Sequence, residues 1–286
     1  MRWTPGGESR DIEDRRGQSR GRGIHIGLGG ALVLLVLSLI FHRDFFSLLG
    51  GGTDTGTVAT ADSGAVGAPA STPEEDRLVQ FVSFILDDDQ KTWERLEPAA
   101  FGTPYRHAKL VLFRDVTETA CGEGETATGP FYCPQDEKVY IDLGFYDELR
   151  RRFGAPGDFA QAYVIAHELG HHVQKLAGIE ERARRAMQSD PSGANAISVR
   201  LELQADCFAG VWGHSAAQRN LLEAGDAREG IDAAAAVGDD RLQRMSTGQV
   251  RADAFTHGSS AQRAHWFERG FERGDPRACD TFSASE

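Results

Sequence analysis

The chain has 286 residues, of which 26% are charged and 40% are apolar, and this composition is typical of a globular protein rather than a fibrous one. Its formal net charge of -12 disfavours nucleic acid as a partner, because nucleic-acid-binding proteins present a basic surface. The charge is uneven. Six arginines accompany four acids before residue 24, so the acidic excess lies in the rest of the chain.

The first predicted element is a long apolar run. Residues 24–41 read IHIGLGGALVLLVLSLIF, in which His25 and Ser38 are the polar side chains. A helix of about 18 such residues is just long enough to cross a hydrocarbon core of roughly 30 Å. A cleaved signal peptide is the alternative, but its apolar region is usually shorter, and no small-x-small cleavage site follows closely. We therefore expect a transmembrane helix over residues 23–42.

The flanks of this run predict the orientation of the chain. Arginines crowd the N-terminal side, so residues 1–22 are expected to form a cytoplasmic tail and the rest of the chain to lie outside the cytoplasm, behind a single-pass membrane anchor. Residues 50–73 contain few large apolar side chains, which predicts a flexible linker. A single folded domain is then expected over residues 74–286.

The four cysteines fit an oxidising compartment. Their number is even and no CxxC pair occurs, which argues against a structural zinc ribbon. Two disulfides are expected, Cys121 with Cys133 and Cys207 with Cys279. Four buried thiols are the alternative.

Three further segments have predictable local structure. Apolar positions from Leu78 to Leu86 predict a helix, and the acidic run 87–89 after them is expected to be its solvated end. The sequences KLVLF at residues 109–113 and VYIDL at residues 139–143 predict strands, because they are rich in β-branched and aromatic side chains.

Residues 158–177 form the most strongly predicted helix. Apolar side chains recur there at steps of three and four, and the helix contains HELGH at residues 167–171. Positions i and i+4 of a helix are neighbours, so His167 and His171 can bind the same metal ion. Glu168 is rotated by about 100° from His167, which lets it act on a water molecule without being a ligand. Zinc makes such a water more acidic, and a carboxylate base can take its proton.

A catalytic zinc site needs a third protein ligand. The metzincin pattern would place a histidine at position 177, where Ala177 stands, so that class is excluded. The other source is a carboxylate on a second helix. Glu202 and Asp206 are one helical turn apart on a largely apolar helix that begins near Asn195, and burying two acids there requires a cation or hydrogen-bond donors. Glu202 is the expected ligand, and Asp206 is expected to accept a hydrogen bond from the far nitrogen of His167.

These motifs resemble those of a known family. The sequence HELGHHVQ followed by LELQADCFAGVW resembles the bacterial neutral zinc metallopeptidases, which are membrane-anchored. The glutamate–aspartate pair is also similar to that of gluzincin peptidases, in which the glutamate is the metal ligand. The likeness covers nearly all of residues 76–286, through the strings at Cys121–Pro134, Val139–Leu143, Gly238–Gln243, Thr256–Arg263 and Cys279–Phe282.

The resemblance implies a zincin-like α+β fold, mostly helical, with a small sheet above the active-site helix. It implies that Val139, Tyr140 and Ile141 form the edge strand that binds an extended substrate by its backbone. His257, in the string THGS, resembles a histidine of membrane gluzincins that would stabilise the oxyanion opposite the zinc. A structural histidine that caps the next helix is an equal alternative.

The sequence therefore predicts a zinc endopeptidase with one zinc ion and a protein or peptide substrate. Two alternatives share the same site: a non-proteolytic module that binds envelope components, and an amidase that acts on cell-wall peptides. Glu168 argues against the first alternative, because a binding module has no need of a catalytic base.

Overall fold

The computed structural model describes residues 1–17, 71–125, 129–151, 154 and 157–283. The expected transmembrane helix at residues 23–42 lies outside these residues, as does the expected linker up to residue 70. None of the helices in the described part of the chain is long and apolar enough to cross a membrane. The segment Met1–Arg16 forms one compact unit with the residues from Ser71 onward.

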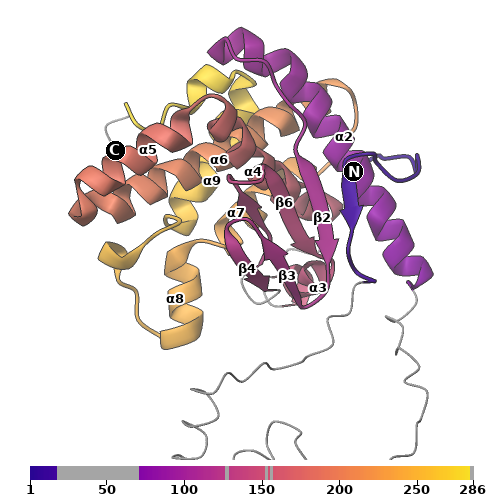
Figure 1. Cartoon of the computed structure of the whole chain (residues 1–286), viewed down its shortest axis with the longest axis horizontal. Coiled ribbons are helices and arrows are strands. Elements are labelled where there is room, and N and C mark those ends of the chain that lie inside the picture. The colour runs from indigo at the N-terminus through magenta and orange to yellow at the C-terminus, as the bar shows by residue number, and fades with distance from the viewer. Residues whose placement is uncertain (18–70, 126–128, 152–153, 155–156, 284–286) are drawn as a thin grey trace, which may run out of the picture. The chain divides into compact units, whose positions relative to one another are not determined.

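A four-stranded mixed sheet lies at the centre of this unit (Figure 1), in the order β1-β2-β6-β5. Strands β1, β2 and β6 are parallel, and β5 is antiparallel to β6. The strands are β1 (Ile12–Asp14), β2 (Lys109–Phe113), β6 (Lys138–Asp142) and β5 (Phe131–Cys133). A separate antiparallel pair consists of β3 (Val116–Thr119) and β4 (Gly122–Glu125). The strands expected near residues 109–113 and 139–143 are thus confirmed as β2 and β6.

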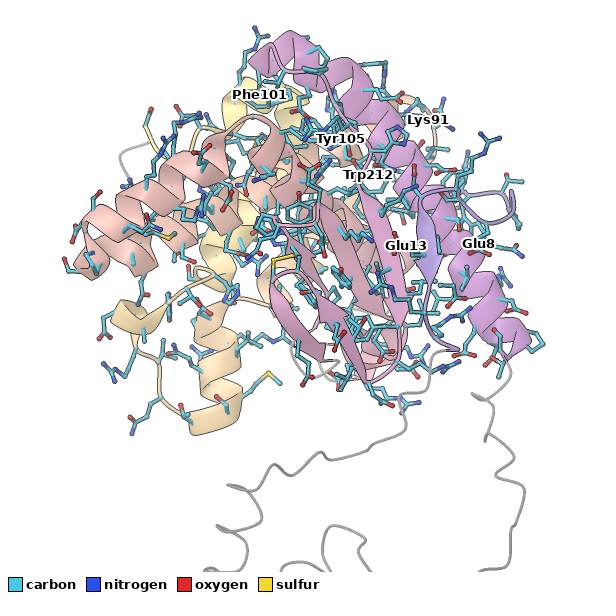
Figure 2. All side chains as sticks on the ribbon, viewed as in Figure 1. Glu8, Glu13, Lys91, Phe101, Tyr105 and Trp212 are labelled. Carbon is cyan, nitrogen blue, oxygen red and sulfur yellow. A yellow bond between two sulfur atoms is a disulfide. The ribbon has the colours of Figure 1, made fainter. Side chains whose placement is uncertain are left out.

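Strand β1 comes from the arginine-rich N-terminal segment, which the sequence predicts to lie outside the folded domain. Ile12 lies opposite Leu110 of β2. Glu13, labelled in Figure 2, forms an ion pair with Lys138 at 2.7 Å. The N-terminal ammonium of Met1 lies 3.3 Å from a carboxylate oxygen of Glu223. Residues 1–16 are therefore an integral part of the unit that contains the sheet.

Helices make up most of the remaining structure, which agrees with the expected α+β class. The first of them, α2, runs without a break through residues 87–89, so the prediction that its end lies there was wrong. Asp88 accepts a hydrogen bond at 3.0 Å from the indole of Trp212, labelled in Figure 2, and Asp89 is fully buried. The helices are α2 (Pro73–Phe101), α3 (Gly144–Arg151), α4 (Asp158–Leu176), α5 (Ile179–Ser189), α6 (Ala194–Gln218), α7 (Asp226–Ala236), α8 (Asp239–Thr247) and α9 (Ser260–Arg273), with 3-10 turns η3 (Pro191–Gly193), η4 (Ala252–Ala254) and η5 (Pro276–Cys279).

The main core forms between one face of the sheet and helix α4. Alternate residues of β2 and β6, such as Leu110 and Ile141, point into this core, because successive side chains of a strand face opposite sides. Helix α6 packs against α4 and also crosses α9 very closely. A Cβ atom at Gly270 would lie 1.9 Å from the carbonyl oxygen of Cys207, so only glycine fits at this crossing. The tight α6–α9 contact fixes the position of α6 beside α4.

Both expected disulfides are present. Cys121 joins Cys133 at the end of β5, and Cys207 on α6 joins Cys279 at the end of η5. The second bond fastens the C-terminal segment to the helix that also carries Glu202 and Asp206. Free cysteines are absent from the described residues.

Candidate metal centre

The two histidines of HELGH lie one helical turn apart on α4. The helix spans Asp158–Leu176, within one residue of the expected end. The ring centroids of His167 and His171 are 4.9 Å apart, and both side chains line a cleft of about 720 Å³. The helical spacing therefore places both imidazoles at one point of the cleft, as predicted.

Helix α6 brings the third candidate ligand to the same point. Helices α4 and α6 can approach because residue 170 has no side chain: a Cβ atom at Gly170 would lie 3.0 Å from the carbonyl oxygen of Ala205. The carboxylate oxygens of Glu202 then lie 3.3 Å from Nε2 of His167 and 3.5 Å from Nε2 of His171. The sequence predicts this convergence of two helices, and the described residues contain it.

These two distances, one to each carboxylate oxygen of Glu202, are close to the separations of donor atoms around a zinc ion. Tetrahedral zinc with bonds of 2.0–2.1 Å to nitrogen and oxygen separates neighbouring donor atoms by about 3.3–3.4 Å. One donor atom from each of His167, His171 and Glu202 lies within 4.8 Å of the other two. Two imidazoles and one carboxylate leave the fourth position open, which is the arrangement of a catalytic rather than a structural zinc site.

A buried ionic network orients His167. Its Nδ1 lies 2.9 Å from Oδ1 of Asp206, which is fully buried, as expected from the sequence. Asp206 also accepts hydrogen bonds from Tyr163 Oη at 2.5 Å and from the Nε of Arg263 at 2.8 Å. Burial favours the neutral acid, but Arg263 and His167 outweigh it and hold the pKa of Asp206 below its usual value. Because Asp206 is then a carboxylate, it accepts the proton of Nδ1 of His167, so Nε2, which faces Glu202, is the ring nitrogen that would bind a metal.

The charge of Glu202 suits a ligand. Burial raises its pKa, but His171 and His167 act in the opposite direction and hold the pKa far below the usual range. The side chain is therefore ionised at every pH at which the protein would work, and metal ions bind carboxylates in this form.

Glu168 lies in the same cleft with 8% of its surface exposed. Its burial raises the pKa of the carboxyl group above the usual value for glutamate. A raised pKa makes a carboxylate a stronger base, which favours proton transfer from water near neutral pH. Glu168 thus lies in the same cleft as the two histidines, where the sequence predicts it.

The strand at the cleft is β5 and not β6. Val139, Tyr140 and Ile141 are almost fully buried, and β6 is bonded to β2 on one side and β5 on the other. The prediction that they form the edge strand was therefore wrong, because both edges of β6 are already paired. The edge strands of the described sheet are β1 and β5, and Phe131 and Tyr132 of β5 line the cleft.

His257 also lines the cleft, with half of its side chain exposed. One carboxylate oxygen of Asp239 accepts hydrogen bonds from the backbone N–H groups of Thr256, His257 and Gly258, at 2.6 to 3.0 Å. The other oxygen lies 3.2 Å from Nδ1 of His257. This hydrogen bond raises the pKa of His257, although burial acts in the opposite direction. Asp239 thus fixes the loop that carries His257 beside the site.

The roles of Arg263 and Tyr163 at this site were not predicted from the sequence. Arg263 and Tyr163 both line the cleft and hold Asp206. A signal for Arg263 exists in the sequence, since it occupies the same helical face as Trp266, Phe267 and Gly270, where a charged residue is unexpected without a buried partner. Tyr163 carries no such signal, because a tyrosine on an apolar helix face is ordinary.

Two histidines on one helix, a glutamate from a second helix and a buried carboxylate beside the first histidine are the features of a hydrolytic metal centre of the HExxH type. Residues 1–282 match the family described as "putative neutral zinc metallopeptidase", and the chain belongs to this family.

Two relatives in this comparison have names that state no function. The Escherichia coli protein named "Uncharacterized protein YpfJ" is 47% identical over 295 residues, covering 100% of both chains. A Mycobacterium tuberculosis protein, "Uncharacterized protein Rv2575", is 43% identical over 205 residues, which are 68% of this chain and 67% of its own. No solved structure matches significantly.

Proposed function

We propose that this protein is a zinc-dependent endopeptidase. The observation that carries the proposal is the spacing of the donor atoms of His167, His171 and Glu202, which fits tetrahedral zinc, beside the buried carboxylate of Glu168 in a cleft. The volume of about 720 Å³ falls in the range of pockets that hold a ligand the size of a short peptide.

Each residue then has a chemical task. Zinc, when bound by the two histidines and Glu202, supplies Lewis acidity that polarises the peptide carbonyl and acidifies water. Glu168 accepts a proton from the water that attacks the carbonyl carbon and delivers it to the departing amine nitrogen. His257, with its pKa raised by Asp239, donates a hydrogen bond to the carbonyl oxygen as negative charge develops there.

The residues that line the cleft favour an extended peptide with large apolar side chains as the substrate. The outer edge of β5, which pairs with no other strand among the described residues, can bind an extended peptide through backbone hydrogen bonds. Many of the side chains around the site are apolar, so we expect cleavage beside large apolar residues; they are Phe131, Tyr132, Phe145, Leu149, Val164, Leu242 and Met245.

The test is Glu168→Gln compared with the wild-type protein, in a peptide-library assay together with zinc analysis. The variant is expected to bind one zinc ion per chain and to lose at least a thousandfold in turnover, since glutamine cannot take a proton. Glu181→Gln, on the exposed face of α5, is the matched control and should keep full activity. Hydrolysis by Glu168→Gln at the wild-type rate would refute the mechanism.

A further inference from the structure

The far nitrogen of His171 is held differently from that of His167. Nδ1 of His171 lies 2.9 Å from Oε1 of Gln174, one turn further along α4. Gln174 is 1% exposed, and its amide nitrogen donates to the carbonyl oxygen of Leu201 at 2.7 Å and to Oε1 of Gln204 at 3.1 Å. The histidine is thus joined through a neutral amide to α6, at the residue directly before Glu202.

The hydrogen bonds of Gln174 determine which ring nitrogen of His171 carries the proton. Both hydrogens of the Gln174 amide nitrogen have an acceptor, so its Oε1 is left as the acceptor for the imidazole. His171 must then donate from Nδ1, which leaves the lone pair on Nε2, the nitrogen that faces Glu202. Rotating the amide would place its nitrogen against Nδ1 and its oxygen against two carbonyl-type oxygens.

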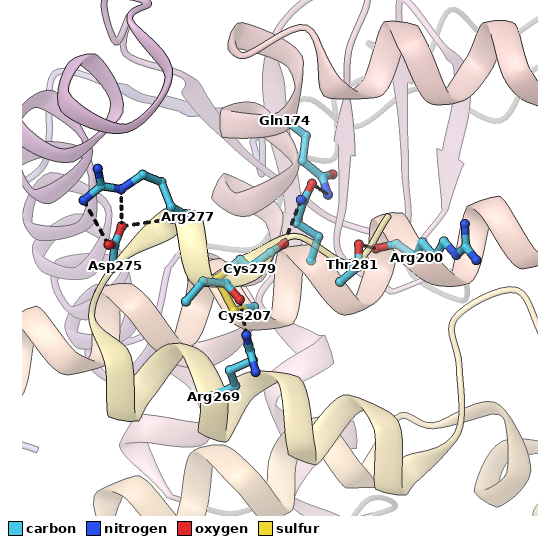
Figure 3. The surroundings of a disulfide bond; sticks show 10 residues. Gln174, Arg200, Cys207, Arg269, Asp275, Arg277, Cys279 and Thr281 are labelled. Atoms are coloured by element: carbon cyan, nitrogen blue, oxygen red, sulfur yellow. Dashed lines mark hydrogen bonds and ion pairs between the residues drawn. A yellow bond between two sulfur atoms is a disulfide. The ribbon is translucent and has the colours of Figure 1, made fainter. Parts of the chain in front are cut away.

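The hydrogen bonds continue from Gln174 to the second disulfide. The amide nitrogen of Gln204 donates at 2.8 Å to the carbonyl oxygen of Cys279, whose sulfur is bonded to Cys207. Figure 3 shows Gln174 on one side of Cys279 and the disulfide on the other. The hydroxyl of Thr281 also donates, at 2.7 Å, to the carbonyl oxygen of Arg200. The segment around Cys279 is therefore held on the face of α6 formed by residues 200, 204 and 207.

We propose that Gln174 and Gln204 are positioning residues that keep His171 in its metal-binding tautomer, and that the Cys207–Cys279 disulfide holds the far end of this chain of hydrogen bonds. The proposal rests on the proposed zinc site. Reduction of the disulfide releases the segment around Cys279, removes the acceptor for Gln204, and weakens the hold of the site on zinc. His167 is independent of this chain, because the Asp206–Arg263 pair orients it.

The first experiment measures zinc affinity by competition with a chelator, which needs no activity. Loss of an outer hydrogen-bond partner of a metal ligand typically costs 10–100-fold in affinity. Gln174→Met is expected to fall in this range, and Gln204→Met, one step further away, to lose about threefold to tenfold. Gln218→Met, at the exposed end of α6, is the control and should bind zinc like the wild type. Wild-type affinity for Gln174→Met would overturn the proposal.

The second experiment removes the disulfide. Replacing Cys207 and Cys279 together by alanine should lower zinc affinity as much as Gln204→Met does, and adding Gln204→Met to that variant should change it less than twofold. Replacing Cys121 and Cys133 is the matched control and should leave the affinity unchanged. If removal of the Cys207–Cys279 disulfide prevents folding, Thr281→Val, which loosens the same segment, replaces it. Unchanged affinity in the folded variant would overturn the role of the disulfide.

These outcomes separate the two proposals. A wild-type chain that binds no zinc refutes the proposed function itself. A wild type that binds zinc and cleaves peptides, with glutamine variants that bind zinc equally well, refutes only the positioning role. Substitution of cobalt for zinc gives a further measure, because the visible absorption of bound cobalt reports ligand geometry. This absorption should change more in Gln174→Met than in Gln204→Met.

Discussion

The replacement of Arg263 by methionine tests the ionic network behind the metal centre. Arg263 is 4% exposed and donates from Nε to Oδ2 of Asp206 at 2.8 Å and from Nη2 to Oδ1 at 2.9 Å. Tyr163 and His167 also contact Asp206, but both reach Oδ1. Without Arg263, the buried carboxylate of Asp206 keeps hydrogen-bond partners on Oδ1 only, and it loses the positive charge of the guanidinium.

The expected cost follows from this count of partners. Removing one member of a buried ion pair typically costs ~3–5 kcal/mol. Because Tyr163 and His167 remain, we expect the lower end, about 3 kcal/mol for Arg263→Met. In urea unfolding of the zinc-free protein this lowers the midpoint by roughly 1 M or more, at a slope of about 1–3 kcal/mol per molar.

The control is Arg273→Met, on the same helix but exposed, which should change stability by less than about 0.5 kcal/mol. Adding Asp206→Asn to Arg263→Met removes the buried charge and should recover part of the loss, giving a coupling energy of about 2 kcal/mol. Equal unfolding midpoints for Arg263→Met and Arg273→Met would refute the reasoning.

Two further predictions concern α4 and α2. Gly170→Ala should lower the free energy of unfolding in urea by about 1–3 kcal/mol and weaken zinc binding, because the added Cβ pushes α4 away from Ala205 of α6. In a helix without this contact, a change from glycine to alanine would increase stability. A more stable Gly170→Ala variant would therefore contradict the close contact. Burial raises the pKa of Glu97 from 4.5 to about 7, so its contribution to stability is full below pH 4.5 and is lost as the pH rises to 7. This pKa shift limits the effect of Glu97 on the free energy of unfolding to at most ~3 kcal/mol, and solvent screening makes the effect smaller. Glu97→Gln should therefore be about 1–2 kcal/mol more stable than the wild type at pH 8 and equally stable near pH 4; equal stability at both would contradict it.

The candidate metal site could be predicted from the sequence because its geometry is mostly local. The spacing of His167 and His171 is set by the helix itself, and the same holds for Glu202 and Asp206. Their convergence needed one more argument, that two acids on a buried helix require a cation or donors. The free-energy cost of burying these acids thus indicates that the two helices meet, which periodicity alone does not reveal.

The errors arose where pairing between distant segments decides the outcome. Whether β6 is an edge strand depends on β5, which has three residues and no strand signal of its own. The residues around Asp88 were expected in solvent, because the sequence does not show that Arg219, which forms an ion pair with Asp88, returns to the same place. Gln174 was invisible for the same reason, since its role depends on Leu201 and Gln204.

Strand β1 has the largest consequence for how the protein is placed in a cell. A helix that crosses a membrane once puts the segments before and after it on opposite sides. The pairing of Ile12–Asp14 with β2 requires the two segments to be on the same side, so a single-pass anchor and a paired β1 exclude each other in one chain.

We therefore expect a cysteine introduced at Glu8 and one introduced at Glu272, both exposed positions, to react alike with a membrane-impermeant maleimide in intact cells. Equal reaction supports the pairing of β1 in the cellular protein, whichever side it is on. Modification at position 272 with protection at position 8 would mean that β1 is not paired there, and would restore the orientation that the arginines predict. The sheet thus turns a question of membrane topology into one of strand pairing, because hydrogen bonds between β1 and β2 cannot form across a bilayer.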